Sequence, residues 1–199
     1  MQLLWKKIKS GQKTYLAFFC VGLLAGFFLL NLGKGILLGE KGLFDENTLY
    51  QMKYMTVDGS AFFGYIFRKR MVRLLVLAVL SSTYLGLVVC MGTVFWYGMS
   101  AGMVLASLTI RYGVKGIMLA FISIFPQCLL YIPMALALLA WCEELFRCIY
   151  VRGEFGAGDK GFVVKKAGRL AVILIAAALG CLLEGYVNPY LLLGFLKIF

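Results

Sequence analysis

Long uncharged stretches of apolar residues alternate with shorter charged stretches along the whole chain. A helix needs about 20 apolar residues to cross a bilayer, so each long stretch is a candidate transmembrane span. The candidate spans cover roughly residues 15–32, 74–92, 95–110, 116–141 and 167–187, and the polar connections cover residues 34–70 and 143–166. This pattern predicts an all-α fold, a polytopic membrane helix bundle of about five transmembrane helices in a single membrane domain over residues 1–199.

The second and third candidate spans come from one uncharged run over residues 74–110. This run is too long for a single crossing and therefore has to contain a turn. We place a tight hairpin near Trp96, Tyr97 and Gly98, or a few residues earlier near Gly92.

The fourth span carries two prolines, Pro126 and Pro133, with Gln127 directly after the first. A proline in a helix interior removes a backbone donor and costs about 3 kcal/mol. In lipid, neighbouring helices or polar side chains must satisfy the freed carbonyl group. We therefore predict a proline-broken fourth helix at the centre of the bundle. The alternative is that the prolines only bend the helix, because proline is common in membrane helices.

The last span contains Glu184, the one carboxylate far enough inside an apolar run to need an explanation. A charge inside a bilayer is costly. We expect Glu184 either to be protonated and face the fourth span, with Gln127 opposite it and Tyr131 as another partner, or to be solvated at headgroup depth. In the first case Glu184→Gln should have a mild effect. Helical spacing places Gly180 on the same face, and Asn188-Pro189 is expected to end the helix.

Small residues recur at the four-residue spacing that allows two membrane helices to approach closely. The candidate packing positions are Gly22 and Gly26 in the first span, Gly98 and Gly102 in the third, and Gly180 in the fifth. The six cysteines lie mostly within apolar runs and include no CxxC pair. We interpret them as small packing residues rather than as a disulfide framework.

The connection over residues 34–70 predicts two further helices. Asp45 is expected to cap a short helix that ends before Asp58. Residues 61–73 hold aromatic side chains followed by a basic cluster, which is typical of a helix lying on the membrane surface.

Composition and charge agree with a membrane protein, because 62% of the residues are hydrophobic and the mean hydropathy is +0.91. The formal net charge is +11. Lysine and arginine flank the spans, so we attribute this charge to topology and to contact with the lipid bilayer, and we expect no nucleic-acid partner. With residues 34–70 as a polar connection, the two sides carry equal numbers of basic residues. The first helix then decides the orientation, with the N-terminus inside and the C-terminus outside.

The sequence lacks the residue patterns of common enzymes. It contains no histidine, which excludes Ser-His-Asp triads and HExxH zinc sites. It also contains no P-loop and no GxSxG motif. We therefore predict a non-enzymatic protein with no catalytic residue, cofactor or metal site. A small membrane transporter or channel is the alternative, because kinked helices and an intramembrane glutamate are common in transporters.

Three features together resemble the stage II sporulation protein M family over about residues 15–190. The first is five spans with a polar segment after the first span. The second is Pro126-Gln127 followed by Pro133. The third is Glu184-Gly185-Tyr186-Val187-Asn188-Pro189, which is similar to the family's Glu-x-aromatic-aliphatic-Thr-Pro with Asn188 in place of threonine. In the wider family the fourth-span motif reads Pro-His-Gly-x-x-Glu-x-Pro, and here Gln127, Cys128 and Tyr131 stand at its His, Gly and Glu positions.

The resemblance implies a function that the residues alone do not indicate. It implies a membrane scaffold that anchors a peptidoglycan-degrading complex during forespore engulfment in sporulation. The implied partners are the stage II sporulation proteins D and P, which carry the lytic transglycosylase and the amidase/endopeptidase activities. The implied location is a bacterial cell membrane, specifically the engulfing mother-cell membrane. The departures at Gln127, Cys128 and Tyr131 argue against a proton or metal role at these positions.

Overall fold

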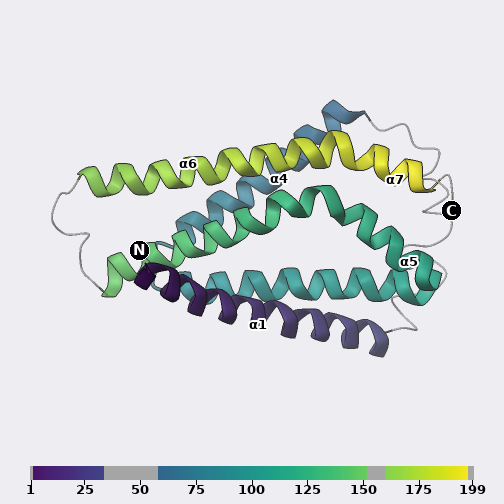
Figure 1. The fold of residues 1–199 in the computed structure, drawn as a ribbon, viewed down its shortest axis with the longest axis horizontal. Helices are drawn as coiled ribbons and strands as arrows, with labels where there is room; N and C mark the ends of the chain where they lie inside the picture. The colour runs from purple at the N-terminus through teal and green to yellow at the C-terminus, as the bar shows by residue number, and fades with distance from the viewer. Residues whose placement is uncertain (1, 34–57, 152–159, 197–199) are drawn as a thin grey trace.

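The structure, a computed structural model, describes residues 2–33, 58–151 and 160–196, and every element within these ranges is helical (Figure 1). The elements are α1 (Gln2–Leu32), α4 (Gly59–Leu80), α5 (Gly86–Phe146), the π-helical turn η1 (Arg147–Val151), α6 (Lys160–Leu182), the π-helical turn η3 (Leu183–Val187) and α7 (Asn188–Leu196). The short helix expected after Asp45 lies outside the described residues.

Four stretches of the described residues are long and apolar enough to cross a membrane. They are Lys13–Leu32, Gly86–Phe125, Gln127–Tyr150 and Val164–Gly194. The predicted all-α membrane helix bundle is therefore confirmed.

Helix α5 turns back on itself at Gly113, whose φ of 56° and ψ of −133° interrupt the helical conformation. Residues other than glycine rarely adopt this conformation, because their Cβ atom would collide with the backbone. Gly116 then packs directly against the carbonyl group of Leu108, where a side chain would not fit. As a result α5 forms two antiparallel arms, residues 86–112 and residues 114–146 (Figure 1).

The chain turns between α4 and α5 at residues 81–85, so the prediction of a hairpin near Trp96–Gly98 is wrong. The hydroxyl groups of Ser81, Ser82 and Thr83 donate to the carbonyl oxygens three residues earlier, at 2.7, 2.7 and 2.6 Å. These bonds satisfy the last carbonyl groups of α4 without water, so the helix can end inside an uncharged run. The expected span 74–92 therefore contains the end of α4 and the start of α5, and residues 95–110 lie within the first arm.

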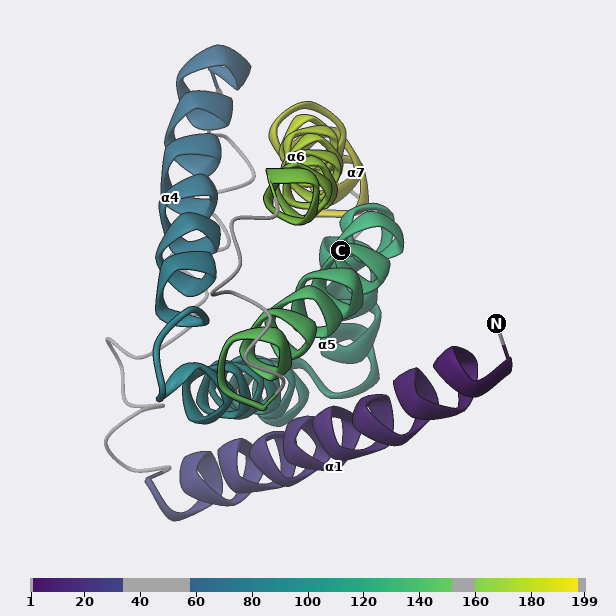
Figure 2. The same ribbon diagram turned by 90° about the vertical axis from the view of Figure 1, so that its left-hand side faces the viewer.

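Residues 61–73 belong to the longer helix α4, which packs against α5, α6 and the η3 turn, so the predicted helix does not stand alone. Its inner face buries Ile66 and Ala78. At its start the Asp58 side chain accepts a hydrogen bond from the Ser60 amide at 3.1 Å, as an N-cap does. The Ser60 side-chain and backbone donors hold the pKa of Asp58 below its usual value. Figure 2 shows α4 at the margin of the bundle, steeply inclined to α6.

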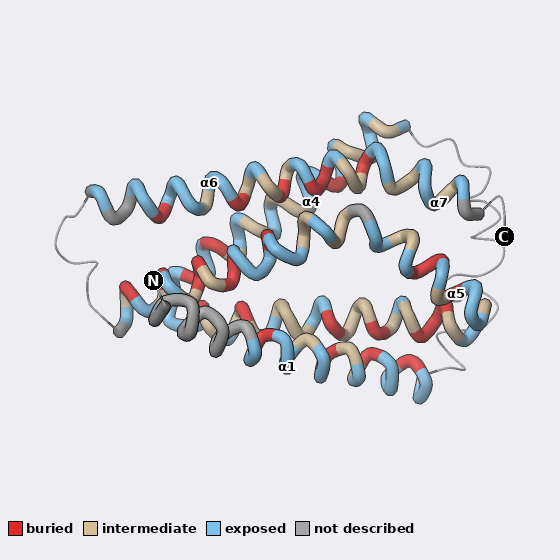
Figure 3. The backbone as a smooth tube through the Cα atoms, viewed as in Figure 1, coloured by how far each residue is buried: buried red, intermediate tan, exposed pale blue. Residues whose placement is uncertain are grey.

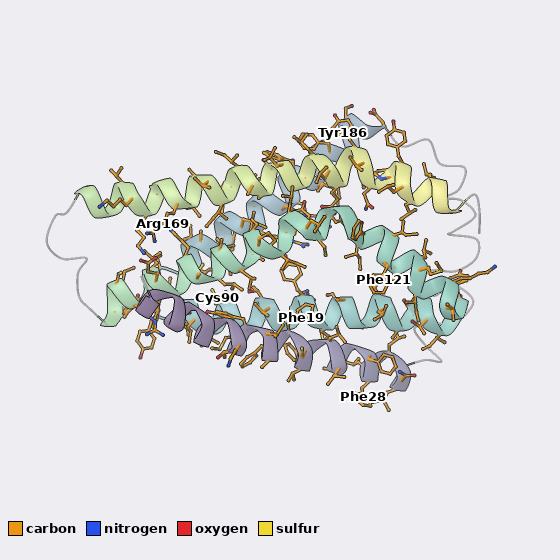
Figure 4. The ribbon with its side chains drawn as sticks, in the orientation of Figure 1. Phe19, Phe28, Cys90, Phe121, Arg169 and Tyr186 are labelled. Atoms are coloured by element: carbon orange, nitrogen blue, oxygen red, sulfur yellow. The ribbon has the colours of Figure 1, made fainter. Side chains whose placement is uncertain are left out.

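The first arm of α5 packs against α1, and glycines on both helices make the contact. A Cβ atom added at Gly22, Gly26, Gly98 or Gly102 would collide with a backbone carbonyl oxygen of the other helix. The contacts advance in the same direction along both helices, so α1 and this arm run parallel (Figure 1). Phe19 of α1 lies in this interface (Figure 4). The two glycine pairs that the sequence singled out therefore face each other.

The second arm of α5 stays helical through Pro126 and Pro133, and Figure 1 shows it bent rather than broken. Close to the first proline, Gln127 Nε2 donates to the carbonyl oxygen of Ser123 at 3.0 Å. Pro126 leaves the carbonyl group of Ile122 without its helical donor, and the Gln127 side chain donates to the neighbouring carbonyl group instead. The expected break is therefore a bend, in agreement with the alternative interpretation.

The last helix does not end at Asn188-Pro189, contrary to the prediction, but continues through η3 into α7. In η3 the amide of Asn188 donates to the carbonyl oxygen of Leu183, five residues earlier. This is the π-helical pattern, which widens the helix locally. Pro189 then lies close to the start of α7, where a missing backbone donor is tolerated.

The larger core cluster of the described residues joins α4, both arms of α5 and α6, with Tyr15 of α1 (Figure 3). All six cysteines are free, and Cys90, Cys142, Cys148 and Cys181 are buried, as expected for packing residues. Large apolar side chains remain exposed on the outer surface, which is the arrangement that a lipid-facing surface requires.

Candidate functional site

Arg70 and Glu184 form an ion pair between α4 and the η3 turn. Arg70 Nη2 donates to Glu184 Oε1 at 2.7 Å, and Arg70 Nε donates to Glu184 Oε2 at 2.8 Å. The two parallel bonds use the planar fork of the guanidinium group, which makes such pairs strong and specific in geometry. Arg70 was not among the predicted partners of Glu184, because its segment was assigned to the membrane surface.

Tyr131, on the second arm of α5, completes the site. Its hydroxyl donates to Glu184 Oε2 at 2.8 Å. The Arg70 guanidinium lies over its ring, with 4.2 Å between Arg70 Cζ and the ring centroid, which is a favourable cation–π contact. Cys181 Sγ lies 3.5 Å from the Tyr131 hydroxyl oxygen. The site therefore joins α4, α5 and the last helix.

Glu184 accepts hydrogen bonds through both carboxylate oxygens, an arrangement that fits an ionised carboxylate. One oxygen accepts one bond and the other accepts two, and all donors belong to Arg70 or Tyr131. A carboxyl group that only accepts hydrogen bonds is the ionised form. Glu184 therefore does not donate to Gln127, and we now expect Glu184→Gln to be more than mild. Glutamine would turn a donor toward groups that already donate.

The pair lies at mid depth in the bundle and is partly shielded. Arg70 and Tyr131 stand near the middle of α4 and of the second arm of α5. The Glu184 side chain is 16% exposed and that of Arg70 is 33% exposed. An unpaired arginine at the centre of a membrane helix costs about 2.5–3.5 kcal/mol on insertion scales. Pairing with a carboxylate at the same depth offsets this cost.

Two glycines of the last helix make room for the site. A Cβ atom at Gly180 would lie 2.6 Å from Tyr131 Cε1, and one at Gly185 would lie 3.0 Å from Phe63 Cβ. Phe63 of α4 also lies beside Tyr186, with 5.9 Å between the ring centroids (Figure 4). These close approaches bring α4 and the second arm of α5 against the same short segment of the last helix.

The structure brings together only some of the predicted site residues. Tyr131, Gly180 and Glu184 meet, whereas Gln127 bonds to its own helix and does not pair with Glu184. Gln127 Oε1 and Asn188 Oδ1 are buried without a hydrogen-bond partner. The remaining predicted positions are prolines: Pro126 and Pro133 in the bent arm and Pro189 in α7.

A second polar cluster lies where the second arm of α5 ends. Glu144 Oε2 pairs with Lys166 Nζ and with Arg169 Nη1, at 2.8 Å each (Figure 4). Trp141 Nε1 donates to the carbonyl oxygen of Lys166 at 3.0 Å. This cluster ties α6 to α5 at the end of the bundle that also carries the N-terminus of the chain (Figure 1).

The central site can stabilise the bundle, but it offers little for catalysis. Both oxygens of Glu184 are engaged, and the Tyr131 hydroxyl hydrogen is directed at one of them. Among the described residues, no group of three His, Cys, Asp or Glu side chains could hold a metal ion. We call the group formed by Arg70, Tyr131 and Glu184 the central clamp. The Arg70 side chain is its most exposed charged group.

Gly180→Ala is expected to displace Tyr131 and to lower the free energy of unfolding by about 1–2 kcal/mol, because one hydrogen bond to a charged group is lost. The matched control is Gly168→Ala in the same helix, where a Cβ atom meets nothing within 4 Å. It should be neutral or slightly stabilising, since alanine favours helix over glycine. Reversible unfolding in mixed detergent micelles measures both, and equal losses would contradict the proposed contact.

Comparison with known proteins identifies the family. A family profile described as stage II sporulation protein M matches residues 15–189, a range that contains Arg70, Tyr131 and Glu184. No curated protein and no solved structure matched the chain. The match covers most of the chain, and the chain therefore belongs to the stage II sporulation protein M family.

Proposed function

We propose that this chain is a non-enzymatic membrane scaffold that anchors a peptidoglycan-degrading complex during forespore engulfment. Membership of the family implies a role in sporulation. The observation that carries the proposal is the central clamp, in which the only described carboxylate at mid depth is used to join three helices. A scaffold needs such a fixed frame, whereas a hydrolase needs an acid or base that is free to act on substrate.

The proposed partners are the stage II sporulation proteins D and P. A tagged chain captured from sporulating cells is expected to retain both partners, identified by mass spectrometry. The purified chain alone should release no muropeptides from peptidoglycan. Release by the pure chain that a point mutation in the chain abolishes would overturn the proposal, as would capture without either partner.

The order of the helices bears on the orientation. Because α1 and the first arm of α5 are parallel, the chain has to cross back between them. Residues 34–57 contain too many charged residues to span a bilayer, so α4 has to make the return crossing. The basic residues of α4 are then counted on neither side of the membrane. By chain order, ten lysines and arginines remain on the N-terminal side and six on the other, which favours an N-terminus inside the cell.

This orientation predicts that a cysteine at Asn47 reacts with an impermeant thiol reagent in intact cells, once the native cysteines are replaced. A cysteine at Ser82, in the turn on the opposite side, serves as the matched control and should react only after lysis. The reverse labelling pattern would contradict the orientation.

The proposed location is the engulfing mother-cell membrane.

A transporter or channel is the second candidate function. It is favoured by the partial exposure of Arg70 at mid depth, because ionisable residues inside membranes often line a solute pathway. Purified chain in planar bilayers would then conduct ions or release entrapped solutes from vesicles. An absence of current and of release, with the chain inserted, would remove this candidate.

A further inference from the structure

Helix α4 carries basic residues at mid depth that the central clamp does not use. Arg68, Lys69 and Arg73 are exposed and stand on either side of Arg70. Lys69 Nζ donates to the Tyr65 hydroxyl at 2.9 Å, which is a neutral partner. Among the described residues no carboxylate pairs with any of the three. If α4 crosses the membrane as proposed above, each is an uncompensated charge in the middle of a crossing helix, which hydrocarbon disfavours.

Helical spacing collects two of these charges on one outward stripe. Tyr65, Arg68, Lys69, Val72 and Val76 follow one another at intervals of three or four residues, or are adjacent, and thus share a face. All five are exposed, whereas Ile66 and Ala78 face the bundle. Figure 2 shows α4 at the edge of the bundle. The outward stripe is therefore apolar at its ends and basic at its centre.

A second copy of this chain does not supply the missing negative charge. The described carboxylates are Asp58 at the start of α4, Glu143 and Glu144 at the end of α5, and Glu184. Only Glu184 lies at mid depth, and it is already engaged by Arg70 and Tyr131. The other acidic residues lie in the connections 34–57 and 152–159, between the helices. The described residues of a second copy therefore offer no free carboxylate at this depth, which favours a different protein as the source of the complementary charge.

We infer that the outward stripe of α4 binds a transmembrane helix of a partner protein, and that this helix carries one or two carboxylates near the bilayer midplane. Apolar residues of the partner would pack on Val72 and Val76, and its carboxylates would pair with Arg68 and Lys69. Desolvated charge pairs of this kind select the partner strongly, because a neutral helix leaves the cations unpaired. The inference deepens the scaffold proposal and rests on it for the existence of a membrane-embedded protein partner.

A designed peptide tests the inference without knowledge of the natural partner. The probe is a single leucine–alanine transmembrane helix with two glutamates one turn apart at its centre, and its twin carries glutamines. Full-length chain with a fluorescent acceptor is reconstituted with donor-labelled peptide in phosphatidylcholine vesicles, and energy transfer reports association. We expect the glutamate peptide to bind about tenfold more tightly than the glutamine peptide, as loss of one desolvated charge pair suggests.

Three double variants decide whether the outward stripe is responsible for the preference. Arg68→Gln/Lys69→Gln should bring the glutamate peptide down to the level of its twin. Lys13→Gln/Lys165→Gln removes the same charge from exposed positions at the starts of two candidate spans and should preserve the preference. Arg68→Glu/Lys69→Glu should reverse it in favour of a lysine peptide, which guards against a variant that merely misfolds.

Three outcomes would overturn the inference: equal binding of the two peptides, a preference that survives Arg68→Gln/Lys69→Gln, or a preference that disappears when phosphatidylglycerol is added. The last would assign the stripe to anionic lipid instead of protein. Each outcome is separable from the scaffold proposal, because capture of the natural complex from sporulating cells does not depend on the designed peptide.

Discussion

Replacing Glu184 by leucine is expected to lower the free energy of unfolding by about 3 kcal/mol, because Arg70 is left unpaired inside the bundle. The Arg70 side chain is 33% exposed, so the loss should lie at the lower end of the range for breaking a buried pair. Glu184→Gln should lose about 2 kcal/mol, because charge-assisted hydrogen bonds are replaced by weaker ones. Reversible unfolding in mixed detergent micelles measures these changes.

A double mutant separates the pair from the rest of the site. Arg70→Met is expected to be about as harmful as Glu184→Leu, but Arg70→Met/Glu184→Leu should recover most of the stability. Two apolar side chains leave no charge without a partner, and replacing a whole ion pair by apolar residues is often neutral. If the double mutant instead loses the sum of the single losses, the two residues do not act as a pair.

The exposed pair between Glu143 and Arg147 provides the control. The two residues lie one helical turn apart near the end of α5, and 46% of the Arg147 side chain is exposed. Glu143→Gln should change stability by about 0.5 kcal/mol or less, as expected for exposed pairs. A similar loss at Glu143 and at Glu184 would show that detergent stability responds to charge in general and not to the clamp.

The sequence predicts the fold class well, because the hydrophobic pattern that marks a membrane span is long and contains few exceptions. It does not predict where the helices end inside residues 74–110, since nothing charged interrupts that run. The end of α4 depends on three consecutive hydroxyl side chains that cap it locally. The triplet Ser81-Ser82-Thr83 was the available signal, and it is a weaker marker than a charge or a proline.

The central clamp could be predicted only in part. Glu184, Tyr131 and Gly180 were identified because a carboxylate in an apolar run, a polar residue in a proline-containing helix and a small residue at helical spacing are each unusual. Arg70 was missed because it belongs to a basic cluster, and such clusters usually lie at the membrane surface. Which member of the cluster turns inward depends on how α4 packs. The parallel arrangement of α1 and the first arm of α5, from which we infer that α4 crosses the membrane, is likewise a tertiary property.

Gly102→Leu is expected to separate α1 from the first arm of α5 and to lower the free energy of unfolding by about 3 kcal/mol, the upper range for overpacking a close contact. A Cβ atom at Gly102 would collide with the carbonyl oxygen of Leu23, and a backbone cannot rotate away as a side chain can. Among the described elements α1 packs only against α5, so no other contact would hold it in place. Gly26→Leu, from the opposite side of the interface, should behave in the same way.

Gly92→Leu is the matched control, because Gly92 lies on the same arm and a Cβ atom there meets nothing within 4 Å. It should be neutral or slightly stabilising, since leucine favours helix over glycine. Limited proteolysis at the N-terminal end should become faster in Gly102→Leu and remain unchanged in Gly92→Leu, because only the first variant releases α1. If both variants unfold like the parent chain, the glycines do not set the distance between the helices. The parallel interface would then lose its support, and with it the requirement that α4 cross the membrane.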